Sequence, residues 1–108
     1  MVEYAFSLDS VFGSLADPTR RDILRRVSND ELSVSEIAKS YDLTLAAISK
    51  HLKVLEKASL IIKRRRGKEQ MVSLAPQAMA DAMEYLQWYQ QFMSARYDSL
   101  ENYLSKEA

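Results

Sequence analysis

Residues 33–57 read SVSEIAKSYDLTLAAISKHLKVLEK and predict two helices joined by a short turn. The first opens at about Ser33, which has the spacing of a capping box with Glu36. Thr44 is the expected N-cap of the second helix, which runs to about Lys57. Its apolar stripe consists of Leu45, Ile48, Leu52 and Leu55. Two helices this close, the second basic on its other side, are typical of a helix-turn-helix.

The flanking segments complete the expected fold. Apolar side chains recur at helical spacing over residues 8–15, and Asp17-Pro18 is the expected N-cap and first residue of a second helix. Two β-prone runs around a basic tip predict a hairpin over residues 60–74. Pro76 then begins a helix that runs to about Ser105. The fold class is therefore mainly α with a small β-hairpin.

The C-terminal helix carries more apolar surface than one chain can cover. One seam repeats at 3-4 spacing through three heptads, with Gln90 as a polar member, and Tyr85, Tyr89 and Phe92 form a stripe beside it. Core and dimer seam is the simpler interpretation of these aromatics, and a ligand pocket is the alternative. The expected dimer interface comprises Leu8, Val11, Phe12, Met83, Leu86, Gln90, Met93, Tyr97, Leu100 and Leu104.

Composition excludes several kinds of site. The chain has no cysteine and a single histidine, His51, so disulfides, thiolate metal sites and a His-rich metal cage within one chain are impossible. No Gly-rich phosphate loop, paired-carboxylate site or nucleophile triad is present, so we expect neither an enzyme nor a cofactor. An apolar run of about 18 residues and a secretory leader are also lacking, which predicts a cytoplasmic protein without a membrane partner.

The net charge is zero, but the charges are segregated along the chain. Residues 44–74 hold 8 basic and 2 acidic residues, a net of +6, whereas residues 1–43 and residues 75–108 each carry −3. Local sign matters more than the total for an electrostatic partner, so the central stretch is expected to bind a polyanion.

Three segments in order resemble the ArsR-type winged-helix repressors: LADPTRRDIL at residues 15–24, AISKHLKVLEKASLI at residues 47–61, and the basic hairpin at residues 60–74, which corresponds to the wing of that family. The resemblance covers about residues 8–104 and implies a dimeric winged helix-turn-helix that represses transcription. In this family the second helix of the helix-turn-helix, here residues 44–57, is the recognition helix. Relatives usually have Ala-Gly after it, where this chain has Ala58-Ser59. That departure implies either strain at a left-handed C-cap or a different turn.

Metal sensing is not expected of this member. The arsenic and cadmium sensors of the family carry Cys-Val-Cys where this chain has SVS at residues 33–35, and serine hydroxyls bind soft metals poorly. Zinc-sensing members use Asp and His on the C-terminal helix, which here offers Asp81, Glu84 and Asp98 but no histidine. We therefore expect a metal-independent subgroup without metal ligands, whose inducer the sequence does not identify.

The resemblance places DNA contacts at the start of the recognition helix and in the wing. That half of the helix meets base edges, so Lys50 is a candidate donor to guanine and Ser49 to a base or a phosphate. The wing arginines are expected to follow phosphates, with one in the minor groove. The full set is Thr44, Leu45, Ala46, Ser49, Lys50, His51, Lys53, Arg64, Arg65, Arg66 and Lys68.

Some of these assignments have alternatives. Leu45 either contacts a thymine methyl or packs in the core, and His51 either donates to a phosphate or hydrogen-bonds a neighbouring helix. The basic residues of the wing either bind DNA or protect an edge strand, and with only Glu69 opposing them we favour DNA. The arginines of the second helix are expected to be mostly structural, with nearby aspartates as partners: Arg20, Arg21, Arg25 and Arg26, with Asp17, Asp22 and Asp30.

The resulting hypothesis is a homodimeric transcription factor that binds double-stranded DNA at a palindromic operator and represses its own operon. The alternative is a helical adaptor or anti-repressor that acts by protein–protein contact and binds DNA weakly. The domain prediction is one winged-helix DNA-binding domain over residues 1–108, with dimerisation helices at 1–15 and 76–105, the helix-turn-helix at 33–57 and the wing at 60–74.

Overall fold

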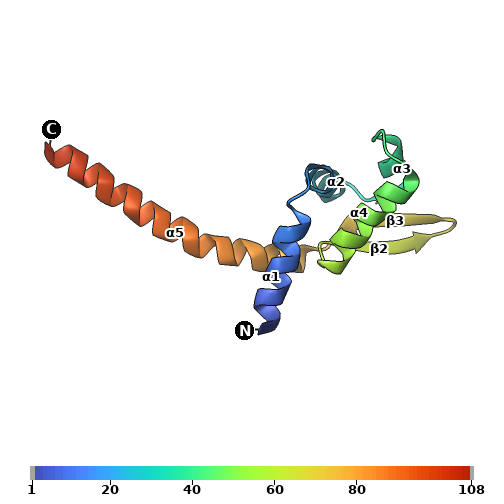
Figure 1. Cartoon of the computed structure of the whole chain (residues 1–108), viewed down its shortest axis with the longest axis horizontal. Helices are drawn as coiled ribbons and strands as arrows, with labels where there is room; N and C mark the ends of the chain where they lie inside the picture. The colour runs from blue at the N-terminus through green and yellow to red at the C-terminus, as the bar shows by residue number, and fades with distance from the viewer. Residues whose placement is uncertain (1, 108) are drawn as a thin grey trace.

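The helix-turn-helix, the wing and a long terminal helix follow one another along the chain (Figure 1). The computed structural model describes the backbone of residues 2–107 and the side chains of residues 8–106. Its elements are α1 (Val2–Ser14), α2 (Pro18–Asn29), β1 (Leu32–Ser33), α3 (Val34–Lys39), α4 (Leu45–Lys57), β2 (Ile61–Arg66), β3 (Glu69–Leu74) and α5 (Pro76–Glu107). The mainly helical fold class predicted from the sequence is confirmed.

Side-chain caps fix where three of the helices begin. Asp17 and Thr44 cap α2 and α4, each by accepting a hydrogen bond from the backbone N–H three residues further on. Ser33 and Glu36 form the predicted capping box of α3, with hydrogen bonds of 3.1 and 3.0 Å. Backbone N–H donors stabilise the ionised carboxylates, so the pKa values of Asp17 and Glu36 lie below their ordinary values.

The sheet has three antiparallel strands in the order β1-β3-β2, one more than the sequence predicts. β2 and β3 form the wing hairpin, which turns at Gly67, whose φ of 62° suits a residue without a Cβ. β1 pairs with β3 through Leu32 and Ser33 alone. Two residues are too few to show the alternation by which a strand is recognised, which explains why β1 was missed.

The recognition helix passes into the wing through a left-handed residue. Ser59 has a φ of 60°, so the first of the two expected alternatives, the strained C-cap, is correct. The N–H of Leu60 donates to the Leu55 carbonyl at 3.0 Å, and the N–H of Ser59 donates to the Glu56 carbonyl at 2.9 Å. These two hydrogen bonds make a Schellman motif, which ends α4 at the left-handed residue Ser59.

One hydrophobic core joins α1, α2, α3 and α4 to the sheet and the start of α5. Its fully buried members include Ile23, Ile37, Ile48, Leu55 and Val72. Leu8 and Val11 also belong to this core, with exposed fractions of 7% and 1%. Their placement in the dimer interface is corrected here, because their side chains are already buried within one chain and offer a partner almost no surface.

α5 leaves the rest of the molecule soon after it begins (Figure 1). Ala78 and Ala82 are buried against the core, whereas every residue from Met83 to Lys106 is exposed. We call residues 8–82 the head and residues 83–106 the tail. Because of the tail the molecule measures 66 × 33 × 20 Å. None of the helices within residues 2–107 combines the length and apolar character that crossing a membrane requires.

Candidate nucleic-acid interface

α4 turns one side to the core and the other to solvent. Ile48, Leu52 and Leu55 are buried on the inner side. Leu45 is 59% exposed, so the alternative in which it packs in the core is wrong. As the first residue of α4 it lies beyond the turns that the core covers. The outer side presents Leu45, Ala46, Lys50 and Lys53, with Ser49 half-buried beside them.

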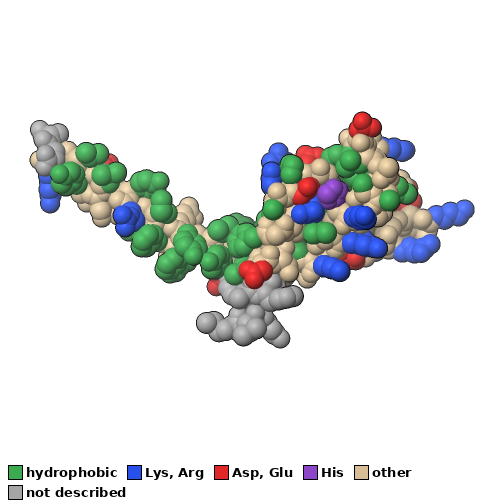
Figure 2. All heavy atoms as spheres, viewed as in Figure 1, with side chains coloured by type: hydrophobic (Ala, Val, Ile, Leu, Met, Phe, Trp, Pro, Cys, Tyr) green, Lys and Arg blue, Asp and Glu red, His purple; other side chains and the backbone are tan. Residues whose placement is uncertain are grey.

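His51 lies on the flank of α4 that faces the start of α2. Its Nδ1 is 3.4 Å from Nη1 of Arg20 and 3.9 Å from Oδ2 of Asp17. Of the two expectations for this residue, contact with a neighbouring helix is the one that the structure shows. Figure 2 shows the same histidine at the molecular surface beside basic side chains. Since Nδ1 is turned toward α2, a contact with a phosphate would have to be made by Nε2.

Two arginines of α2 hold the end of α1. Nε of Arg20 donates to the carbonyl oxygen of Ser14 at 2.6 Å, and Nη1 of Arg21 donates to that of Leu15 at 2.8 Å. Carbonyl groups at a helix C-terminus lack partners within the helix and attract cations. The role of both side chains is structural, as expected, although their hydrogen-bond acceptors are carbonyl oxygens rather than aspartates.

The other two arginines of α2 do not follow one pattern. The Arg26 guanidinium lies 5.5 Å from the centre of the Tyr41 ring, so it stacks on the segment after α3. The carboxylate of Asp22 accepts a hydrogen bond from the Tyr41 hydroxyl instead of pairing with an arginine. Burial raises the pKa of Tyr41, and the Asp22 carboxylate adds to that effect. Arg25 is exposed and no ion pair links it to the described aspartates.

The basic cluster of the wing is partly neutralised from outside the hairpin. Nζ of Lys63 lies 3.3 Å from the Glu56 carboxylate of α4. Glu31, which directly precedes β1, accepts hydrogen bonds through Oε1 from Arg64 at 2.8 Å and from Arg66 at 2.6 Å. The expectation that Glu69 alone opposes this cluster is therefore wrong.

The wing arginines lie on two opposite faces of the sheet. Successive strand residues point to alternate sides, so Lys63 and Arg65 share one face of β2, while Arg64 and Arg66 share the other. The ion pair between Lys63 and Glu56 identifies the first face as the one turned toward α4. Arg65 and Lys68 are exposed and take part in none of the ion pairs found among residues 8–106.

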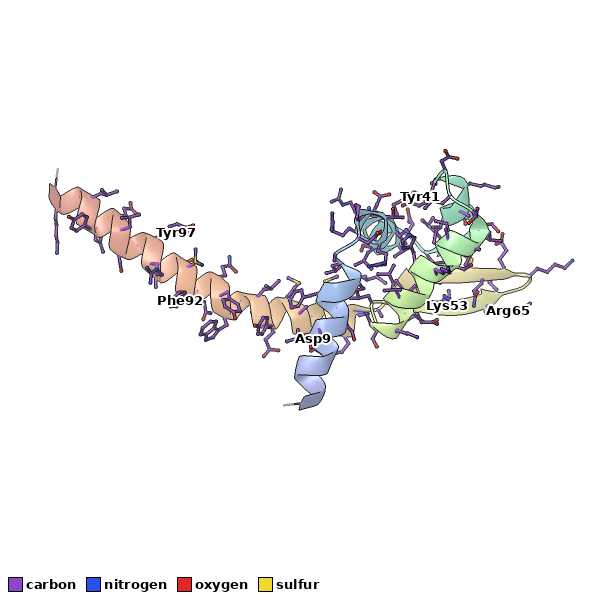
Figure 3. The ribbon with its side chains drawn as sticks, in the orientation of Figure 1. Asp9, Tyr41, Lys53, Arg65, Phe92 and Tyr97 are labelled. Carbon is purple, nitrogen blue, oxygen red and sulfur yellow. The ribbon has the colours of Figure 1, made fainter. Side chains whose placement is uncertain are left out.

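Lys and Arg side chains gather over α4 and the wing, whereas hydrophobic side chains dominate the tail (Figure 2). Figure 3 shows the contrast with single residues: Lys53 and Arg65 project from α4 and β2, and Phe92 and Tyr97 lie far from them along α5. The stretch of basic residues that is contiguous in sequence is thus distributed over the outer side of α4 and over both faces of the wing. This arrangement can bind phosphates with the wing and present Lys50 and Leu45 to base edges in a groove.

The aromatic residues of the tail contact one another along the helix. The Tyr85 and Tyr89 hydroxyl oxygens are 2.9 Å apart, the Trp88 and Phe92 rings stack at 5.9 Å, and the Arg96 guanidinium lies 5.8 Å from the Phe92 ring. Phe92 and Arg96, with Ala95 and Ser99, line an open groove rather than an enclosed ligand pocket. Within residues 8–106 the acidic and histidine side chains form no cluster of three that could hold a metal ion.

Glu31 and Glu56 are the functional candidates that sequence reasoning missed. Glu56 lies within the recognition helix and Glu31 in the segment before β1, and neither has a motif around it. The partners of Glu31 lie 33 and 35 residues away in the chain, so the contact depends on how β1 is placed in the sheet.

Sequence comparisons give results consistent with this geometry. A family model described as a helix-turn-helix domain matches residues 15–64. The HTH-type transcriptional regulator Rv2034 of Mycobacterium tuberculosis is 38% identical over 74 residues, which cover 68% of this chain and 69% of that protein. The transcriptional repressor SdpR of Bacillus subtilis is 29% identical over 79 residues, which cover 73% of this chain and 88% of that protein.

Solved structures agree with the relatives. The ArsR family transcriptional regulator RHA00566 superimposes with a TM-score of 0.76 at 30% identity, over 83% of this chain and 93% of that one. The homodimeric winged helix-turn-helix domain Mb0332 of Mycobacterium bovis shares the fold, with a TM-score of 0.68 at 24% identity over 83% of both chains. The curated relatives are transcriptional regulators and not enzymes. The chain is accordingly a transcriptional regulator with a helix-turn-helix DNA-binding domain, and it belongs to the ArsR family.

Proposed function

We propose that this chain is a homodimeric, metal-independent repressor that acts in the cytoplasm on a palindromic operator of its own operon. The observation that carries the proposal is a basic head joined to a tail whose apolar seam is exposed. A second copy would cover that seam and hold two recognition helices at one duplex. Half-sites about one helical turn apart would then be contacted together, and bound dimer would block polymerase sterically.

The homodimer is supported by the tail itself. Met83, Leu86, Met93, Tyr97, Leu100 and Leu104 are all exposed. Six large apolar side chains on a solvated helix favour association, because burying them removes apolar surface from water. The Mycobacterium bovis domain with the same fold is a homodimer, which favours the same assembly here.

Metal independence is supported by the state of the serines at residues 33–35. Ser33 is buried, and its hydroxyl oxygen accepts the backbone N–H of Glu36 as part of the capping box. That oxygen has a structural role, and a serine hydroxyl is a poor ligand for a soft metal. Repression is supported by the similarity to SdpR, which is a transcriptional repressor.

Within the interface, Lys50 is assigned to guanine and Leu45 to a thymine methyl, because both are exposed at the start of α4. Arg65, Lys68 and Lys53 are assigned to phosphates, to which they bring full charges. Thr44 keeps its N-cap hydrogen bond and Ala46 offers only a methyl group, so we assign them close approach rather than recognition.

The test is fluorescence anisotropy with the DNA upstream of the gene and with a scrambled duplex, each over a salt series. We expect the upstream DNA to bind roughly 10³-fold more tightly. Lys50→Ala should lower that preference, because it removes a base contact. The binding free energy for the upstream DNA should weaken by about 1–3 kcal/mol. Arg65→Ala should weaken binding to both duplexes equally and lower the salt slope by about 1.

Each other outcome has a defined meaning. Equal, salt-dependent binding to both duplexes by the wild type would place the operator elsewhere and remove autoregulation from the proposal. No binding to either duplex would favour the adaptor hypothesis, in which the tail binds another protein.

A further inference from the structure

We propose that Glu31 is an internal counterion of the wing, which withholds Arg64 and Arg66 from phosphates and leaves Arg65 as the arginine of the hairpin that binds DNA. The inference rests on the proposed DNA binding and deepens it. Its basis is a single carboxylate oxygen, Oε1, that accepts a hydrogen bond from each of two guanidinium groups, at 2.8 and 2.6 Å. Charge-assisted hydrogen bonds of this length are among the strong ones.

The sheet places these three charges together. Ser33 of β1 is opposite Met71 of β3, and Met71 is opposite Arg64 of β2, so the three residues form one row across the sheet. Side chains two residues apart on an extended chain point the same way, which puts Glu31 on the face of Arg64 and Arg66. Arg65 is on the opposite face, which carries the Lys63 contact with α4.

The burial of the three side chains favours a lasting contact on the protein side. The Glu31 side chain is 21% exposed, whereas those of Arg64 and Arg66 are 61% and 62% exposed. The carboxylate is thus held near the sheet and the guanidinium groups reach back to it. For either arginine to bind a phosphate, it must first give up an acceptor of the same charge, so the exchange gains little.

Without Glu31, two positive charges on one face of β2 would lack a counterion and would take DNA phosphates instead. Each phosphate neutralised adds about 0.9 to the salt slope and about fivefold in affinity near 0.15 M salt. Glu31 therefore lowers non-specific affinity, and it does so at every sequence, because phosphates carry no base identity.

The first experiment compares the Glu31→Gln variant with the Asp30→Asn variant. Anisotropy over a salt series gives the affinity of each for the scrambled duplex and the salt dependence of that affinity. Both substitutions remove one negative charge, but Asp30 is exposed and makes no ion pair with the described arginines. We expect Glu31→Gln to bind about fivefold more tightly or better, with a slope steeper by about 1 to 2. Asp30→Asn should change affinity by about twofold or less, because screening limits a distant charge. Equal effects of the two substitutions, or weaker binding by Glu31→Gln, would overturn the proposal.

A second pair of variants is first compared in the otherwise unchanged protein, and that comparison does not depend on how Glu31→Gln folds. Arg65→Gln and Arg66→Gln are the same change at adjacent positions of one strand. In the otherwise unchanged protein, we expect Arg65→Gln to lower the affinity for the scrambled duplex about fivefold. Arg66→Gln should lower that affinity about twofold or less. In the Glu31→Gln background, Arg66→Gln should cost as much as Arg65→Gln. An equal loss from both arginines in the unchanged protein refutes the counterion role.

The scrambled duplex separates this proposal from that of autoregulation. If the wild type binds both duplexes equally, the operator assignment fails while every comparison above can still be made. If Glu31→Gln behaves like Asp30→Asn while the upstream DNA is preferred, the counterion role fails and the operator assignment stands.

Discussion

The head and the tail are both rich in large apolar side chains, yet they use them differently. In the head, residues such as Ile23, Ile48 and Leu55 are fully buried among residues of the same chain. In the tail, Tyr97 and Leu100 are 63% and 54% exposed although they repeat with the regularity of a coiled-coil seam. The difference teaches that periodicity identifies an apolar face without saying which molecule covers it. The apolar residues of the head core are buried within one chain, whereas those of the tail are exposed.

The strongest way to break this comparison is to place a charge in the seam. Leu100→Asp should yield monomers, because an isolated carboxylate is costly to bury between two helices. Loss of one half-site contact should lower affinity for the operator by about 10²- to 10⁴-fold. Sedimentation and anisotropy measure the two effects, and Gln91→Asp on the polar side of α5 is the control. A dimer of Leu100→Asp that survives at micromolar concentration would place the interface elsewhere.

A matched pair of truncations sharpens the comparison. Leu55→Ala should lower the free energy of unfolding by about 2–5 kcal/mol at any protein concentration, since Leu55 is fully buried in the head. Leu100→Ala should lower the free energy of unfolding by less than about 0.5 kcal/mol in dilute protein, where the residue is at the surface. The loss should grow as the protein concentration rises. Urea unfolding at two protein concentrations separates the cases. A cost of Leu100→Ala that does not depend on concentration would contradict the assignment of the seam to a partner.

The smallest effect is confined to the head. Ser59→Gly should raise its free energy of unfolding by about 1 kcal/mol or less, because glycine adopts a positive φ without the Cβ clash that serine has. Thermal unfolding measures the gain, and sedimentation should show the same dimer as the wild type. Destabilisation by Ser59→Gly would mean that the serine side chain contributes more than the strain costs.

Local features of this fold could be predicted from the sequence, and distant ones could not. The caps at Asp17, Ser33 and Thr44 depend on residues about three positions apart, so their spacing is visible in the chain. β1 and the contact of Glu31 with two arginines depend on which segments meet in the sheet. Leu8 and Val11 were misplaced for a related reason, because the same helical spacing serves a core of one chain or of two.

The prediction for the candidate site follows the same division. The basic character of α4 and the wing could be predicted, since it depends on composition along the chain. The sequence could not predict which basic residues of the wing already have a counterion, because Glu31 and Glu56 come from other elements. The role of Leu45 was ambiguous because the apolar stripe of a helix does not show how far along the helix the core extends.

The joint between α4 and β2 has a consequence for what the protein requires of DNA. Three kinds of contact join α4 to the hairpin around Ser59: the Schellman hydrogen bonds, the burial of Leu60, and the ion pair between Glu56 and Lys63. These contacts restrain the angle between the two elements, so we expect that angle to change little when they contact a duplex. Adjustment then falls to the nucleic acid, whose bending and groove width depend on its sequence. A rigid joint thereby lets the stiffness of base pairs that the protein never touches contribute to the choice of site.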